Sequence, residues 1–370
     1  MDVNFNNDNL EILTTRARRG EISRRQFTQF AIALLGTAVV AARGTPVLAA
    51  SGELVFVNWG GDATAAYDAA YGKAFTAATG IAFKQDGTGP TEGAIAAQIK
   101  SGKPSWDIVD ADPFSAQSLG KKGMMVPIDY AVVDKKKFRD GFGWEFAASS
   151  YFYSNVLAYD STKYKTAPTG MADFFDVAKF PGKRAMYKWG SGMWEAALLA
   201  DGVAPAALYP LDVARAHAKI AAFKENVVGF WGGGAESQSL LMNGDASMAL
   251  VWSTRAKLLE KDSGGKIKFI WNQGTIAAGS MAVLKGNPGG KDTAMKFIAS
   301  AQDPAKQVIM FNMLGQGPAN PAADAMLSAA DAAYNPVDPK NAAQQVALNM
   351  EWYEKNYGAT LDAYLKIISA

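Results

Sequence analysis

The chain has 370 residues, of which 49% are hydrophobic, with a formal net charge of +2, no cysteine and a single histidine. Without cysteine there are no disulfides, thiolate metal sites or cysteine nucleophiles, and one histidine is too few for most histidine-based triads and zinc sites. The first 50 residues hold six arginines against four acids and so carry the whole net charge. The rest is close to neutral, which argues against nucleic acid or an anionic membrane as partner.

The first 50 residues are typical of a removable export signal. Arg24 and Arg25 precede Phe27 and an apolar run over 30–42. That run is too short to span a bilayer as a helix, which needs about 20 apolar residues. Small residues follow it and place a cleavage site near 49–50. The paired arginines predict that residues 1–50 are a twin-arginine export signal, so that the folded protein reaches the periplasm. An amphipathic helix or a membrane anchor is the alternative.

From residue 54 onward, strand and helix patterns alternate. We expect helices at 62–79 and 91–100, between strands at 54–58, 81–85 and 107–110. Asp62 is expected to cap the first helix and Gly80 to end it. Tyr67, Tyr71 and Phe75 recur every four residues, a spacing that favours core packing over a binding surface. The βαβαβ order predicts a mostly parallel sheet with helices on both faces.

The alternation continues in a second section of the chain. The predicted helices are 194–200, 211–223 and 235–242, and the predicted strands are 156–159, 183–188, 247–252, 266–271 and 280–284. About 320 residues follow the signal, and a single hydrophobic core usually contains fewer. We therefore predict two α/β lobes joined by crossover strands. Lobe 1 is expected over 51–157, with about 277–312 returning to it. Lobe 2 is expected over 158–276, with about 313–370 packing on it.

Few residues are candidates for catalysis. His217 lies on the polar face of a predicted helix and is expected to be exposed to solvent. The glycines at 60–61 and 232–234 lack the Lys-Ser/Thr ending of a phosphate loop. Gly60 follows the first strand, where open α/β sheets bind ligands, so both a ligand contact and a simple tight turn remain open there. Asp112 directly follows the third strand, and we expect it to face a ligand.

Tryptophans gather at predicted strand ends. Trp59, Trp252 and Trp271 lie at or just beyond such ends, and Trp189 and Trp194 flank a strand-to-helix turn. Each alone is expected to be core. As a group, at least two are expected to face a cleft, where they would form a box for an apolar or cationic ligand.

Several short motifs carry a resemblance that covers essentially the whole chain from Leu54. They are Asn58-Trp59, Thr79-Gly80-Ile81, Trp106-Asp107-Ile108-Val109, Phe180-Pro181-Gly182-Lys183, Asn243-Gly244-Asp245, Val251-Trp252 and Gly315-Gln316-Gly317-Pro318-Ala319-Asn320. In this order the chain resembles the extracellular solute-binding proteins of bacterial ABC importers, and specifically their spermidine/putrescine-binding branch. The resemblance implies a type II periplasmic binding protein, with a mostly parallel sheet in each lobe and a hinge of crossover strands. It also implies a monomer without a cofactor that delivers a small solute to a membrane permease.

The resemblance also implies a set of ligand contacts. Aromatic side chains and a carboxylate of the polyamine-binding relatives correspond by position to Trp59, Trp252 and Asp112. Further pocket positions fall on Phe114, Gln316 and Tyr353. We expect Gly60, Asp62 and Trp189, which lie beside these positions, to contact the ligand as well.

Departures from this pattern put the polyamine ligand in doubt. The relatives have an aromatic residue and an aspartate where this chain has Ala277 and Gly279, and carboxylates near the turn where it has Trp189 and Gly192. Arg255 adds a cation that could pair with a ligand carboxylate. The predicted ligand is therefore either of polyamine type or amino-acid-like.

Two other functions are considered. A ferric-ion-binding protein of the same fold would carry adjacent tyrosines, whereas Tyr151 and Tyr153 are separated by one residue. An exported enzyme would need a nucleophile elbow, a metal cluster or usable histidines, which the sequence lacks.

Overall fold

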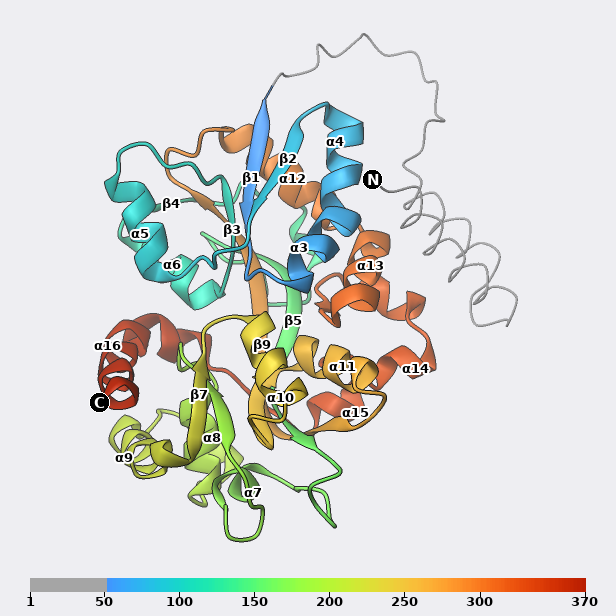
Figure 1. The fold of residues 1–370 in the computed structure, drawn as a ribbon. Coiled ribbons are helices and arrows are strands. Elements are labelled where there is room, and N and C mark those ends of the chain that lie inside the picture. The colour runs from blue at the N-terminus through green and yellow to red at the C-terminus, as the bar shows by residue number, and fades with distance from the viewer. Residues whose placement is uncertain (1–51) are drawn as a thin grey trace.

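The computed structural model describes residues 52–370 (Figure 1). The predicted export signal and its cleavage site lie outside these residues. Within 52–370, no helix combines the length and the apolar character that crossing a bilayer requires.

Two long crossover strands run through the middle of the molecule and connect two lobes (Figure 1). They are β5 (Ala148–Asp160) and β9 (Ile267–Leu284), and they pair with each other in antiparallel fashion. Together with the strands of both lobes they form one sheet in the order β2-β1-β3-β9-β5-β8-β6-β7. The predicted α/β fold with a hinge of crossover strands is confirmed.

The first lobe is built on the parallel strands β1 (Glu53–Val57), β2 (Ala82–Asp86) and β3 (Ile108–Ala111). Its helices are α3 (Asp62–Tyr67), the π-helix η1 (Asp68–Gly72), α4 (Lys73–Thr79), α5 (Glu92–Lys100), α6 (Pro113–Lys121), α12 (Lys291–Ala301) and α13 (Pro304–Leu314). The short strand β4 (Met125–Val126) joins β9. Tyr67, Tyr71 and Phe75 are buried in the core of this lobe, as predicted.

The second lobe is built on β6 (Arg184–Tyr187), β7 (Val227–Trp231) and β8 (Met248–Trp252), in which β6 pairs in parallel with both neighbours. Its helices are α7 (Met171–Phe175), α8 (Met193–Ala200), α9 (Val213–Phe223), α10 (Gly234–Met242) and α11 (Ser253–Asp262). The core packs around the fully buried Trp194 and Trp231.

The C-terminal segment contacts both lobes, not only the second as predicted. It contains β10 (Gly317–Pro318), α14 (Ala329–Ala332), α15 (Pro339–Ala342), β11 (Val346–Ala347) and α16 (Met350–Ser369). Rings of α16 pack on Phe114 of α6 in the first lobe and on Trp194 of α8 in the second. Lys121 and Glu354 form an ion pair that also links α6 to α16.

Three local predictions were wrong. Gly61, not Asp62, is the N-cap of α3, and Asp62 is the first residue of that helix. His217 is buried because its imidazole packs between Trp194 and Tyr364 of α16. The two predicted strands 266–271 and 280–284 are parts of the single strand β9, since the polar and small residues between them pair with β5.

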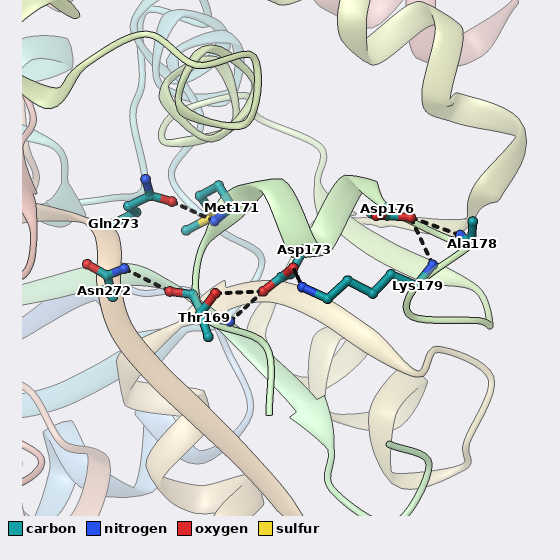
Figure 2. A network of polar contacts seen from close by, with 8 residues as sticks. All are labelled: Thr169, Met171, Asp173, Asp176, Ala178, Lys179, Asn272 and Gln273. Carbon is teal, nitrogen blue, oxygen red and sulfur yellow. Dashed lines mark hydrogen bonds and ion pairs between the residues drawn. The ribbon is translucent and has the colours of Figure 1, made fainter. Parts of the chain in front are cut away.

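A polar network ties α7 to an irregular point of β9 (Figure 2). Gln273 has a positive φ of 60°, and its side-chain oxygen accepts a hydrogen bond from the Met171 backbone N–H at 2.7 Å. Asn272 donates to the Thr169 carbonyl, also at 2.7 Å. Asp173 accepts hydrogen bonds from Thr169 and pairs with Lys179. These contacts stabilise the positive φ of Gln273, a backbone conformation that residues other than glycine rarely adopt.

Candidate functional site

A cavity lies where the two lobes meet, and we call it the central cavity. It is lined by Trp59, Ala63, Asp110, Ala111, Asp112, Tyr151, Tyr153, Tyr187, Trp252, Thr254, Arg255, Leu314 and Gln316. Several of these residues lie at the carboxyl ends of β3, β6 and β8, where open α/β sheets bind ligands. About 30 Å³ of the cavity is open to a water-sized sphere, so a ligand larger than water enters only when the side chains or lobes around it move.

Asp110 is a buried carboxylate at the wall of the central cavity. Its two oxygens accept hydrogen bonds from the hydroxyls of Tyr67 and Tyr151, each at 3.0 Å. Burial outweighs these bonds and raises the pKa of Asp110 to about 7. The carboxyl group therefore titrates near neutral pH.

Asp112 is the second carboxylate of the cavity and lies two residues further along the chain. It is the N-cap of α6, but its side chain makes no capping bond. Instead Oδ1 accepts a hydrogen bond from the Tyr153 hydroxyl at 2.8 Å. Burial raises the pKa of Asp112 to about 6. Tyr151 and Tyr153 are separated by one residue in β5, so both rings lie on the same face of the sheet.

Arg255 supplies a buried positive charge that forms no direct ion pair with a described residue. Its side chain is in the first turn of α11, and the residue is only 2% exposed. Nε and Nη1 have no hydrogen-bond partner, and Nη2 is 3.5 Å from the Gly60 carbonyl oxygen. Among residues 52–370 Arg255 forms no ion pair within 4 Å, and burial lowers its pKa. The guanidinium lies 5.9 Å from the Trp252 ring centre and is attracted by Asp62 and Asp110, but two of its nitrogens stay without a hydrogen-bond partner, which favours a binding partner from outside the chain.

Aromatic rings form the rest of the wall. Trp59 and Trp252 meet edge to face at 5.9 Å, and the Tyr187 ring lies 5.2 Å from Trp252. The Trp59 indole N–H donates to the Asp110 carbonyl at 3.1 Å, which fixes that ring. Buried Trp252 Nε1 has no partner. This wall is apolar with a few polar groups aimed at one point, as in small-molecule sites.

Five of the ten predicted contact residues line the central cavity: Trp59, Asp112, Trp252, Arg255 and Gln316. Gly60 and Asp62 lie beside it, where Gly60 contacts Arg255 and the Asp62 carboxylate accepts from Gln238 across the lobe interface. Trp189 lines a neighbouring cavity instead.

Phe114 and Tyr353 were predicted to contact a ligand but lie beneath the cavity wall. Their rings pack together at 4.9 Å. The Tyr353 hydroxyl donates to the buried carboxylate of Glu195, and the Gly192 N–H donates to that hydroxyl. Both rings therefore belong to the packing between α6, α8 and α16.

Sequence reasoning did not assign Asp110, Tyr67, Tyr151, Tyr153 and Tyr187 to this site. The spacing of two residues between the paired positions 110/112 and 151/153 was the available signal, since it places both members on one face of a strand. Gly279 explains one departure from the polyamine pattern. A Cβ there would lie 2.2 Å from the Tyr151 ring, so this tyrosine occupies the space that a side chain would need.

Comparisons with known proteins show the family of the chain. A family model described as bacterial extracellular solute-binding protein matches residues 70–337. A γ-aminobutyric acid-binding protein from Pseudomonas aeruginosa is 33% identical over 331 residues, covering 87% of this chain and 91% of the relative.

Solved structures agree as well. An ABC transporter substrate-binding protein from Bradyrhizobium japonicum is 34% identical, with a TM-score of 0.78, and covers 86% of this chain and 100% of its own. A binding protein from A. tumefaciens R10 in complex with agropinic acid is 30% identical, with a TM-score of 0.80, and covers 86% and 99%. These relatives are transporter binding proteins and not enzymes. The chain therefore belongs to the bacterial extracellular solute-binding proteins, the components that capture small ligands for ABC transporters.

Proposed function

We propose that the central cavity binds a small amino acid whose ammonium and carboxylate lie at opposite ends, such as γ-aminobutyrate. The ligand carboxylate pairs with the planar guanidinium of Arg255. The ammonium lies against Asp112 and Asp110, with the aromatic wall around the methylene chain. One observation carries the proposal: a buried, unpaired Arg255 lines the same cavity as two carboxylates with which it forms no ion pair.

The relatives support this ligand class. The Pseudomonas aeruginosa relative is named for γ-aminobutyric acid, and the A. tumefaciens relative holds agropinic acid. A polyamine fits less well, because it would place further positive charge near Arg255. Ferric iron also fits less well. The hydroxyls of Tyr151 and Tyr153 donate to aspartates, and burial holds the pKa of both tyrosines well above the usual value, which opposes the phenolate form.

The paired Arg24 and Arg25 support export through the twin-arginine route to the periplasm, where the loaded protein would meet its permease as a monomer. The family membership supports the extracytoplasmic location and the permease partner.

The first test is a ligand series measured by thermal shift and calorimetry. We expect γ-aminobutyrate, present at about 100 times its dissociation constant, to stabilise the protein by roughly 2.7 kcal/mol. Putrescine lacks the carboxylate and butyrate lacks the ammonium, so both serve as matched controls and are expected to bind at least tenfold more weakly. Binding of putrescine in preference to γ-aminobutyrate would reject the proposal.

A second test displaces Arg255 without removing it. A Cβ at Gly234, the first residue of α10, would lie 2.0 Å from Arg255 Nε, so we expect Gly234→Ala to push the guanidinium aside and lower affinity for γ-aminobutyrate tenfold or more. Gly233→Ala is the control, since its Cβ would meet only the Trp59 carbonyl oxygen at 3.8 Å. Equal calorimetric affinities of the two variants would show that the position of Arg255 does not matter.

A further inference from the structure

A second, larger cavity opens beside the central cavity, and we call it the outer chamber. Its volume is about 600 Å³, against about 30 Å³ for the central cavity. It lies between α5 and α6 of the first lobe and α16, together with Trp189 of the second lobe. Trp59, Ala111, Asp112 and Tyr187 line both spaces. The two spaces therefore share part of their lining, and only these residues lie between them.

The charged residues of the outer chamber are mostly acidic. Glu92, Asp112 and Asp362 line it against one cation, Lys122, whose side chain is exposed. Among residues 52–370, none of the three carboxylates forms an ion pair within 4 Å. Asp112 presents its second oxygen, Oδ2, without a hydrogen bond, and half-buried Glu92 lies close enough to Asp112 to raise its pKa. Two neighbouring carboxylates of this kind favour a positive charge between them.

Aromatic side chains also line the outer chamber. Trp59, Tyr187, Trp189 and Tyr357 line it. Two of these rings are fixed by hydrogen bonds, from the Trp189 indole N–H to the Gly232 carbonyl and from the Tyr357 hydroxyl to the Trp189 carbonyl, both at 3.0 Å. A cavity lined by both fixed aromatic rings and carboxylates suits an ammonium or guanidinium group, which gains from both, as Lys188 does over the Trp189 ring at 5.3 Å.

We infer that the outer chamber binds a second cationic group, carried by an amino-acid ligand whose carboxylate lies on Arg255. The inference rests on the proposed function, because it needs the carboxylate end to be held in the central cavity. The ligand class is then an amino acid that bears an additional ammonium or guanidinium beyond its first amine. Asp112 lies at the junction and contacts the middle of such a ligand, and Glu92 and Asp362 face its far end.

Gly358 offers a way to fill the outer chamber without touching the central cavity. It lies in α16 and lines only the outer chamber, and a Cβ there would meet no atom within 4 Å. Gly358→Trp places a large ring in this space, whereas Gly358→Ala leaves it open and serves as the matched control. Glu92→Gln removes one carboxylate with almost no change in volume.

The experiment compares γ-aminobutyrate with its N-(3-aminopropyl) derivative by calorimetry on the purified protein. We expect the wild type to bind both ligands. Gly358→Trp should weaken the extended ligand tenfold or more and leave γ-aminobutyrate within twofold, while Gly358→Ala changes neither. Glu92→Gln should weaken only the extended ligand, by about threefold or more, and this variant decides the matter if the tryptophan variant does not fold.

Three outcomes would contradict the inference in distinguishable ways. If the wild type binds γ-aminobutyrate but not the extended ligand, the outer chamber is not a subsite and the proposed function stands. If the extended ligand binds equally well to the wild type, Gly358→Trp and Glu92→Gln, its second cation lies elsewhere. If neither ligand binds to the wild type, the proposed function itself fails.

Discussion

Replacing Arg255 with methionine is expected to lower affinity for γ-aminobutyrate by about 100-fold or more. A carboxylate that loses a buried, charge-assisted partner loses about 2–5 kcal/mol of binding free energy. The same change should stabilise the ligand-free protein by about 1–3 kcal/mol, because it removes a buried charge whose Nε and Nη1 have no partner. Weaker binding together with higher stability of the ligand-free protein would show that Arg255 serves ligand binding and not folding.

Calorimetry and urea unfolding check the two effects separately. Arg255→Lys keeps the charge but loses the planar fork, so its affinity should fall between those of the wild type and Arg255→Met. Arg139→Met is the control, because Arg139 pairs with Asp324 away from the central cavity and should not affect binding. Unchanged ligand affinity in Arg255→Met would refute the assignment of the carboxylate end.

Affinity for γ-aminobutyrate is expected to fall as the pH drops from 8 to 5. The ligand ammonium and Arg255 stay charged over this range, so the groups that titrate are Asp112, with a pKa of about 6, and Asp110, with a pKa of about 7. At pH 5 only about one ligand-free molecule in ten has an ionised Asp112, which alone gives roughly a tenfold loss. Asp112→Asn should bind weakly at every pH and with a flatter profile.

The matched control for this profile is Asp129→Asn. A hydrogen bond from Lys291 holds the pKa of Asp129 below its usual range, so this carboxylate does not titrate between pH 5 and 8. A pH dependence that is identical in Asp112→Asn and the wild type would exclude Asp112 as the ammonium partner.

The same carboxyl groups make the ligand-free protein less stable at high pH. Asp110 titrates near 3.8 when unfolded and near 7 when folded, so between these values the folded state binds more protons. Its contribution to stability is fully present below about pH 4 and is lost as the pH rises through 7, at most about 4 kcal/mol for a shift of this size. Asp110→Asn should therefore be more stable than the wild type at pH 8 but not at pH 4.

Most elements of the fold could be predicted from the sequence because local patterns and tertiary structure agree. The predicted helix at 91–100 is α5, capped by Thr91, and Gly80 ends α4 in the left-handed conformation that favours glycine. The prediction failed where long-range pairing overrides local pattern. No strand was predicted over residues 272–279, which are mostly polar or small, yet pairing of residues 275–279 with β5 makes them part of β9. His217 is polar, but α16 covers the face of α9 on which it lies.

The cavity wall was predictable only in part. Residues at strand ends, such as Trp59, Asp112 and Trp252, could be found because the fold class places strand ends at the ligand. Asp110 was missed because its one sequence signal, the two-residue spacing to Asp112, does not reveal Tyr67 and Tyr151, which come from distant segments and hold its carboxylate. Tyr67 was correctly assigned to the core from its helical spacing. Its hydroxyl nevertheless reaches Asp110 in the cavity wall, because a tyrosine can bury its ring in the core and place its hydroxyl at a polar site.

The C-terminal helix α16 connects the two lobes in the absence of a ligand. Its rings pack on Phe114 of one lobe and Trp194 of the other, so rotating the lobes apart would uncover Phe114 or shift the helix. That aromatic contact favours approach of the lobes whether or not a solute is present. We therefore expect α16 to shift the equilibrium between open and closed lobes toward the closed arrangement, even without a ligand. A permease that recognises closed lobes would then need a further feature to distinguish the loaded protein from the ligand-free one.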